Sequence, residues 1–138
     1  MLENVYFRGI SAAAISFFSY LFGGMDSLLA ALLAMICIDF VTGIIKAAVF
    51  SDIASEKMMA GGAKKVGMLL IVAVGNLIDH VLELSGVLRS LVISYFIANE
   101  GISMLENWSL MGLPVPGKLK SLLRVLKGQA EEKNAEDE

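Results

Sequence analysis

The chain has 138 residues, of which 57% are hydrophobic and only 18% are charged, and its mean hydropathy is +0.72. A soluble domain is normally about 45–50% apolar and about 25% charged, so this composition indicates a membrane protein. The formal net charge of −3 comes from residues 131–138, where five acidic residues and one lysine sum to −4 and leave +1 for the rest. A near-neutral body without a basic patch excludes a nucleic-acid binder, and the single cysteine, Cys37, excludes an intrachain disulfide framework.

Apolar segments separated by turn signals run through the first 113 residues. Residues 10–22 are short for a membrane span, which needs about 17–25 residues, whereas residues 27–45 and 66–82 are long enough. A fourth segment, residues 89–105, is less apolar and would need protein partners. We therefore predict an all-α integral membrane protein of three to four short transmembrane helices, in a membrane domain spanning residues 1–113. The helices are expected at about residues 10–23, 27–46, 65–83 and 88–106.

The connections between these segments follow from glycine, proline and charge. Gly23-Gly24 and Ser85-Gly86 predict tight turns, and residues 46–65 read as a polar loop in which Gly61-Gly62 breaks the helix. Residues 114–128 predict an amphipathic juxtamembrane helix, and residues 129–138 a disordered acidic tail. The basic side chains expected to face the membrane surface are Lys118, Lys120, Arg124 and Lys127.

The distribution of lysine and arginine predicts the orientation of the chain. Basic residues gather in residues 46–65 and 118–127, and short basic loops stay on the cytoplasmic side. Four helices place both regions and the amino terminus in the cytoplasm, which makes the carboxyl terminus cytoplasmic. Three spans would instead leave residues 10–22 interfacial or re-entrant, with the amino terminus outside.

Several ionisable or strongly polar side chains occur where lipid would be expected. A charge at the centre of a bilayer costs roughly 2.5–3.5 kcal/mol on insertion scales, so such residues usually face protein or water. We expect them at a pore or at helix–helix contacts. They are Asp39, Thr42, Asn76, Asp79, Arg89, Asn99 and Glu100.

Two further features concern helix pairing. Small side chains fall on one face of the first helix, and small residues let helices approach closely in lipid, within one chain or between chains. This face consists of Gly9, Ala12, Ala13, Ser16, Ser19 and Gly23. A hairpin turning near Gly86 would place Glu83 opposite Arg89, which predicts a salt bridge or a pair of interfacial anchors.

Nothing in the sequence predicts catalysis. His80 is the only histidine, and no cluster of ligands has the spacing of a metal site. No nucleophile–base pair, phosphate loop or dinucleotide fingerprint is present. We expect a protein that is not an enzyme and that needs no cofactor or metal.

Four short motifs, in order over about residues 30–127, resemble those of the bacteriophage holins of the toxin-secretion/phage-lysis family. They are Asp39-Phe40-Val41-Thr42-Gly43, Gly61-Gly62-Ala63-Lys64-Lys65-Val66, Asn99-Glu100 with Ser103 and Glu106-Asn107, and Gly112-Leu113-Pro114-Val115-Pro116 followed by Lys118-Leu119. No single motif is specific, but together they are fairly specific. The resemblance implies a non-enzymatic protein that forms homo-oligomers in the cytoplasmic membrane of a bacterial host. It would open lesions through which an endolysin, or a toxin, is released during lysis.

The same intramembrane carboxylates allow a second interpretation. A small oligomeric ion channel or transporter could use them to bind a cation or a proton. The Pro-Val-Pro segment and the amphipathic helix favour the holin.

Overall fold

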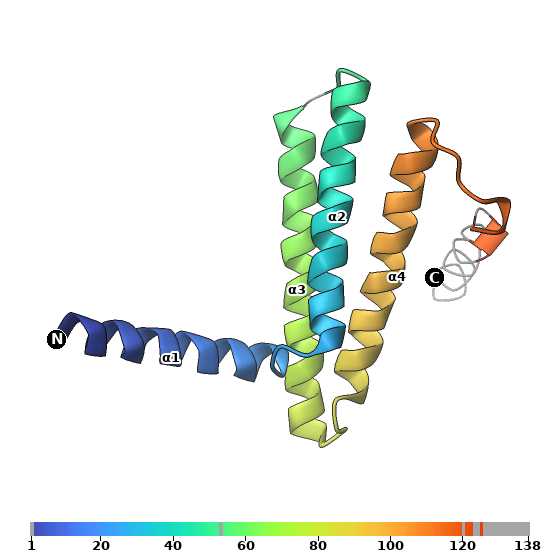
Figure 1. Cartoon of the computed structure of the whole chain (residues 1–138). Helices are drawn as coiled ribbons and strands as arrows, with labels where there is room; N and C mark the ends of the chain where they lie inside the picture. The colour runs from blue at the N-terminus through green and yellow to red at the C-terminus, as the bar shows by residue number, and fades with distance from the viewer. Residues whose placement is uncertain (1, 53, 120, 123–124, 126–138) are drawn as a thin grey trace.

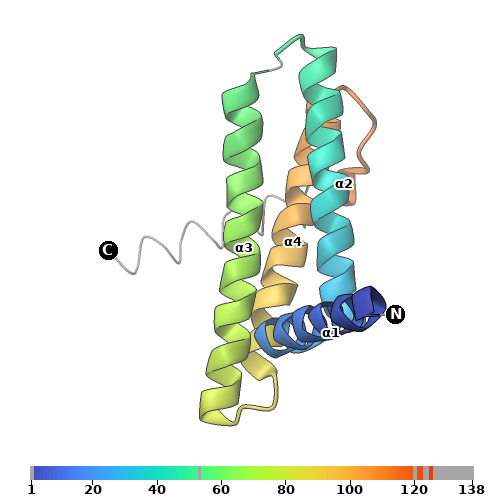
Figure 2. The ribbon, with the colours of Figure 1, turned by 90° about the vertical axis from the view of Figure 1, so that its left-hand side faces the viewer.

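The computed structural model describes residues 2–52, 54–119, 121–122 and 125, and its regular elements in this part of the chain are helical. Four long helices follow one another: α1 (Leu2–Phe22), α2 (Ser27–Val49), α3 (Ser55–Leu82) and α4 (Val87–Leu110). Figures 1 and 2 show α2, α3 and α4 standing side by side as an elongated bundle, from which α1 projects crosswise. α4 packs extensively against α2 and then α3, whereas α2 and α3 make few contacts with each other.

The turn between α1 and α2 depends on its glycines and on one capping side chain. Gly23 and Gly24 have φ values of +75° and +89°, a region that side chains other than glycine rarely adopt. Asp26 then caps α2, because its Oδ1 accepts a hydrogen bond from the Leu29 N–H at 2.8 Å. The predicted turn is therefore present, and it sets α1 across the bundle.

α3 is longer than the sequence analysis expected. It begins at Ser55, so the predicted polar loop over residues 46–65 is reduced to a short connection, and Gly61-Gly62 lie inside the helix. A glycine costs only about 1 kcal/mol relative to alanine inside a helix, and the flanking alanine, lysine and methionine residues are good helix formers. The expected break at these glycines was wrong, and the correction places Lys65 on a membrane helix.

The apolar core lies in the half of the bundle nearest α1. Its fully buried members are Leu29 and Leu32 of α2, Val72 of α3 and Ile93 of α4, with Phe96 close to fully buried. α3 and α4 approach closely at Gly75, where an added Cβ atom would lie 3.4 Å from Val92. The other half of the bundle is held together by polar contacts.

Three helices are long and apolar enough to cross a membrane, which agrees with the expected membrane protein. The candidate spans are Asn4–Phe22, Ser27–Val49 and Ser55–Leu82, and no part of the most apolar stretch of α1 is buried. α4 is less apolar and contacts both α2 and α3, as expected for a helix that needs protein partners. Lys118 is helical and exposed, whereas Lys120, Arg124, Lys127 and the predicted acidic tail at 129–138 lie outside the described residues.

Candidate functional site

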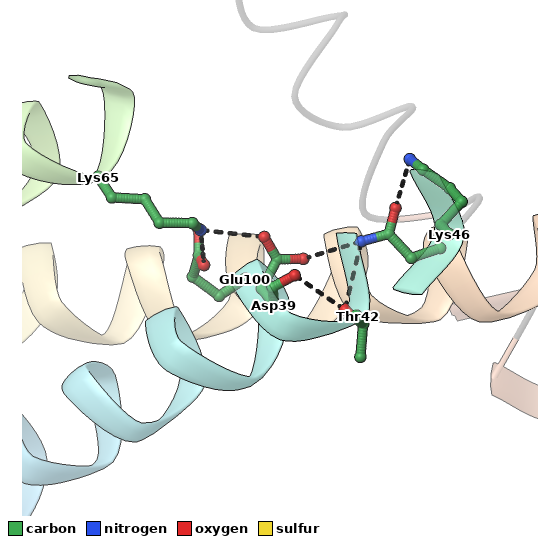
Figure 3. Close-up of polar contacts among 6 residues, drawn as sticks. Asp39, Thr42, Lys46, Lys65 and Glu100 are labelled. Atoms are coloured by element: carbon green, nitrogen blue, oxygen red, sulfur yellow. Dashed lines mark hydrogen bonds and ion pairs between the residues drawn. The ribbon is translucent and has the colours of Figure 1, made fainter. Parts of the chain in front are cut away.

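Three charged side chains meet inside the bundle, one from each of its helices. Asp39 lies on α2, Lys65 on α3 and Glu100 on α4, and we call them the ion cluster (Figure 3). The Lys65 Nζ lies 2.9 Å from Asp39 Oδ2 and also donates to Glu100 Oε2. The side chains of Glu100, Asp39 and Lys65 are only 2%, 11% and 14% exposed. Lys65 is thus the link that joins α3 to both other helices at this level.

A second set of hydrogen bonds extends the ion cluster along α2 and α4. Asn107 Nδ2 donates to Asp39 Oδ1 and to Thr42 Oγ1, each at 3.3 Å, while Lys46 Nζ donates to Asn107 Oδ1 at 2.6 Å. The amide of Asn107 therefore uses both its oxygen and its nitrogen. Thr42 Oγ1 in turn donates to the backbone carbonyl of Asp39 at 2.9 Å. We call the whole set the polar network, which Figure 3 shows as a continuous chain of contacts.

The polar network balances its charges. It contains two carboxylates and two ammonium groups, so its formal charge is zero with all four ionised. Burying a charge is costly unless it is paired and hydrogen-bonded. Within the described residues, every buried side-chain nitrogen or oxygen has a hydrogen-bond partner. A single copy of the chain can therefore hold these groups in an apolar environment without an unpaired charge.

Arg89 organises the opposite end of the bundle. Its guanidinium donates to both oxygens of Asp26, at 2.6 and 3.1 Å, and to the carbonyl oxygens of Phe22 and Gly24 at 2.5 and 3.3 Å. These acceptors all lie in the turn between α1 and α2. The hydrogen bond from Arg89 lowers the pKa of Asp26 to about 2. The predicted Glu83–Arg89 salt bridge is replaced by Asp26–Arg89, because Glu83 ends α3 in a left-handed conformation and is exposed.

Asn76 and Asp79 support the same end from α3. Asn76 Nδ2 donates to the carbonyl oxygens of Tyr20 and Leu21 at 2.9 and 3.0 Å, which satisfies the last turn of α1. Asp79 accepts hydrogen bonds from the backbone N–H groups of Leu88 and Arg89, at 3.0 and 2.6 Å, and so caps the start of α4. Both side chains are almost fully buried and join helices.

The structure separates the remaining sequence-predicted residues from these two sites. Asn99 is exposed and lies outside the polar network, although it neighbours Glu100. On the small-residue face, Gly9, Ala12, Ala13, Ser16 and Ser19 are exposed, while Gly23 sits in the turn against Asn76 and Arg89. Within the described residues no three His, Cys, Asp or Glu side chains converge on a possible metal position.

Sequence reasoning missed three residues of these sites as candidates. Lys65 was assigned to a loop, Asp26 to a turn, and Asn107 was noted on the α4 face without a role. Charge balance is the signal that could have found Lys65, because two deeply placed carboxylates require a cation. Asp26 carried a local signal too, since aspartate directly before an apolar helix is a capping residue.

Comparisons with known proteins place the chain among phage lysis proteins. The model of the bacteriophage holin family matches residues 16–128. A probable holin of Bacillus phage phi105 is 34% identical over 120 residues, covering 87% of this chain and 88% of that protein. Uncharacterized proteins of Listeria monocytogenes and Clostridium perfringens are 37% and 35% identical, covering 87% and 91% of this chain and 88% and 97% of theirs. No solved structure matches.

Proposed function

Because this chain belongs to the bacteriophage holin family, we propose that it oligomerises in the cytoplasmic membrane of a bacterial host and opens lesions during lysis. The lesions would let an endolysin, or in relatives a toxin, cross the membrane. The protein would act through assembly and not as an enzyme. Its partners would be further copies of itself, the lipid bilayer and the released protein.

The observation that carries the proposed assembly is the unpartnered helix α1. Its most apolar 18-residue stretch has no buried residue, and large apolar side chains such as Phe7, Ile10 and Phe17 are 65–74% exposed. Lipid can cover these large side chains. The opposite face, with Ala12, Ala13 and the other small residues, favours close approach of another helix. Within one chain no described helix covers that face, so we propose that a neighbouring copy does.

The positions of the basic residues support a cytoplasmic carboxyl terminus. The end of α2, the start of α3 and the end of α4 lie at the same end of the bundle (Figure 1). Lys46, Lys57 and Lys64 lie at or near this end, and Lys118 follows α4. Short basic segments remain on the cytoplasmic side, so this end would face the cytoplasm. If α1 also crosses the membrane, the amino terminus and Arg8 lie on the same side.

Inducible expression in a bacterium, together with an endolysin that has no export signal, tests the proposed lesion. We expect an abrupt loss of membrane potential, arrest of growth and release of the endolysin activity. Ala12→Leu enlarges the small-residue face and should delay or abolish lysis, whereas Ile15→Leu on the large-residue face should leave its timing unchanged. Normal growth at a high level of membrane-inserted protein would refute the proposal.

An ion channel or transporter is the second candidate, and the ion cluster is the observation that favours it. Clefts lined by Asp39 and Lys65 lie on both sides of this cluster. A channel predicts ion-selective flux in liposomes that Asp39→Asn abolishes, without release of an enclosed protein. Release of a protein as large as an endolysin would decide for the holin.

A further inference from the structure

A cleft opens between α2 and α3 beside the polar network. Its volume is about 630 Å³, and it extends from Asp39 toward the connection between the two helices. Three lysines and several large apolar side chains line it. We call it the basic cleft, and its characteristic residues are Lys46, Lys57, Lys65, Phe40, Ile44 and Phe50.

The lysines of the basic cleft differ in how fully the chain neutralises them. Lys65 is held between two carboxylates and is committed to the ion cluster. Lys46 donates to the neutral amide of Asn107 and forms no ion pair with a carboxylate within the described residues. Lys57 pairs with Asp52 at 2.6 Å, but both side chains are well exposed, 69% and 60%, so water weakens this attraction. The outer part of the cleft therefore offers ammonium groups to an anion from outside the chain.

The wall of the basic cleft is apolar and faces the surroundings of the bundle. Phe40 and Ile44 are each 38% exposed and Phe50 is 56% exposed. All three belong to the last half of α2 or to its C-cap, so they lie along the membrane helix next to its basic end. A small free anion would leave this wall uncovered, and an uncharged lipid would leave the lysines unused. An anionic phospholipid satisfies both features, because its phosphate suits the lysines and its acyl chain suits the wall.

We propose that the basic cleft binds one anionic phospholipid of the phosphatidylglycerol type. The phosphate lies between Lys46 and Lys57, and an acyl chain follows Phe40 and Ile44 between α2 and α3. Such a lipid fills the space where these two helices make few contacts. The binding site goes beyond the proposed function, since it requires membrane residence but not lesion formation.

Two adjacent glycines provide a steric test that leaves the charges unchanged. Gly61 lines the basic cleft, while Gly62 lies outside its lining, and an added Cβ atom would meet nothing within 4 Å at either position. Leucine is a better helix former than glycine, so neither Gly61→Leu nor Gly62→Leu should weaken α3. Native mass spectrometry of the full-length protein, incubated with phosphatidylglycerol or phosphatidylcholine, would count retained lipids. We expect Gly61→Leu to reduce retention of phosphatidylglycerol and Gly62→Leu to preserve it.

A second pair of variants tests the role of charge. Lys57→Gln should lower retention of phosphatidylglycerol about fivefold, the factor that one lysine contributes near an anionic headgroup. Lys64→Gln makes the same change of charge on the same helix outside the basic cleft, and it should have little effect. Equal retention of phosphatidylcholine, or equal losses in both members of either pair, would overturn the proposal. The lysis assay is independent, so a lytic protein that retains no lipid would refute this site and leave the proposed function standing.

Discussion

Replacing Lys65 with methionine tests whether the ion cluster holds the bundle together. Methionine keeps a flexible chain of similar length but removes the ammonium group that serves Asp39 and Glu100. Asp39 would keep its hydrogen bond from Asn107, whereas Glu100 would lose its cation at a position where its side chain is 2% exposed. Removing one partner of a buried ion pair typically costs about 3–5 kcal/mol. Because whole domains are stable by only about 5–15 kcal/mol, Lys65→Met should be severely destabilised.

The magnitude can be measured by unfolding the purified protein in detergent and comparing the free energies of unfolding. Adding Glu100→Gln to Lys65→Met removes the stranded charge, so the double variant should recover at least half of the loss. Lys64→Met, a change at an exposed neighbouring position, is the control for losing a lysine from α3. This control should unfold like the original protein.

Two results would refute this reasoning. If Lys65→Met and Lys64→Met were equally stable, Lys65 would not be a structural link between the helices. If the double variant were less stable than Lys65→Met alone, the penalty would not come from an unpaired Glu100.

Three further predictions concern the turn and the polar network. Gly23→Ala should release α1, seen as faster proteolysis of the turn, because its Cβ would lie 2.8 Å from Arg89 Nε at a φ of +75°; Gly24→Ala meets the same backbone strain without a clash and should have a smaller effect. Asn107→Ala should lower the free energy of unfolding by about 1–3 kcal/mol because it leaves buried polar partners unsatisfied, while a loss near zero would show that water replaces the amide. The pKa of Asp26 is lowered from 3.8 to about 2, so its pair with Arg89 should stabilise the fold above pH 3.8 and lose this contribution as the pH falls toward 2. Acid unfolding curves of Asp26→Asn should lack that dependence, and an unchanged curve would contradict the assigned pairing.

The sequence predicted the number of helices and the first turn because those signals are local. Apolar runs, paired glycines and an aspartate before a helix act over a few residues, and the structure has helices at all four expected places. The extent of α3 was not predictable in the same way, because Gly61-Gly62 breaks a helix in some contexts and is tolerated in others. That single error removed Lys65 from consideration.

The partners of the charged residues were harder to predict because they depend on tertiary packing. The Lys65–Glu100 pair spans 35 residues of sequence and the Arg89–Asp26 pair spans 63. A hairpin argument considers only residues near the turn, so it chose Glu83 for Arg89. The geometry instead sends the Arg89 side chain across the bundle to the α1–α2 turn, where backbone carbonyls add to the attraction of the carboxylate.

The Arg89 contacts also have a consequence for synthesis. Asp26 and Arg89 are 63 residues apart, so at ribosomal rates of about 5–20 residues per second roughly 3–13 s separate their translation. During that interval the glycine turn has neither the guanidinium nor, at first, the Asn76 amide to hold it. The first helix is therefore free to choose its orientation while the nascent chain is still attached to the ribosome. Completion of α4 then fixes that choice, which makes the last long helix the determinant of where the first one stays.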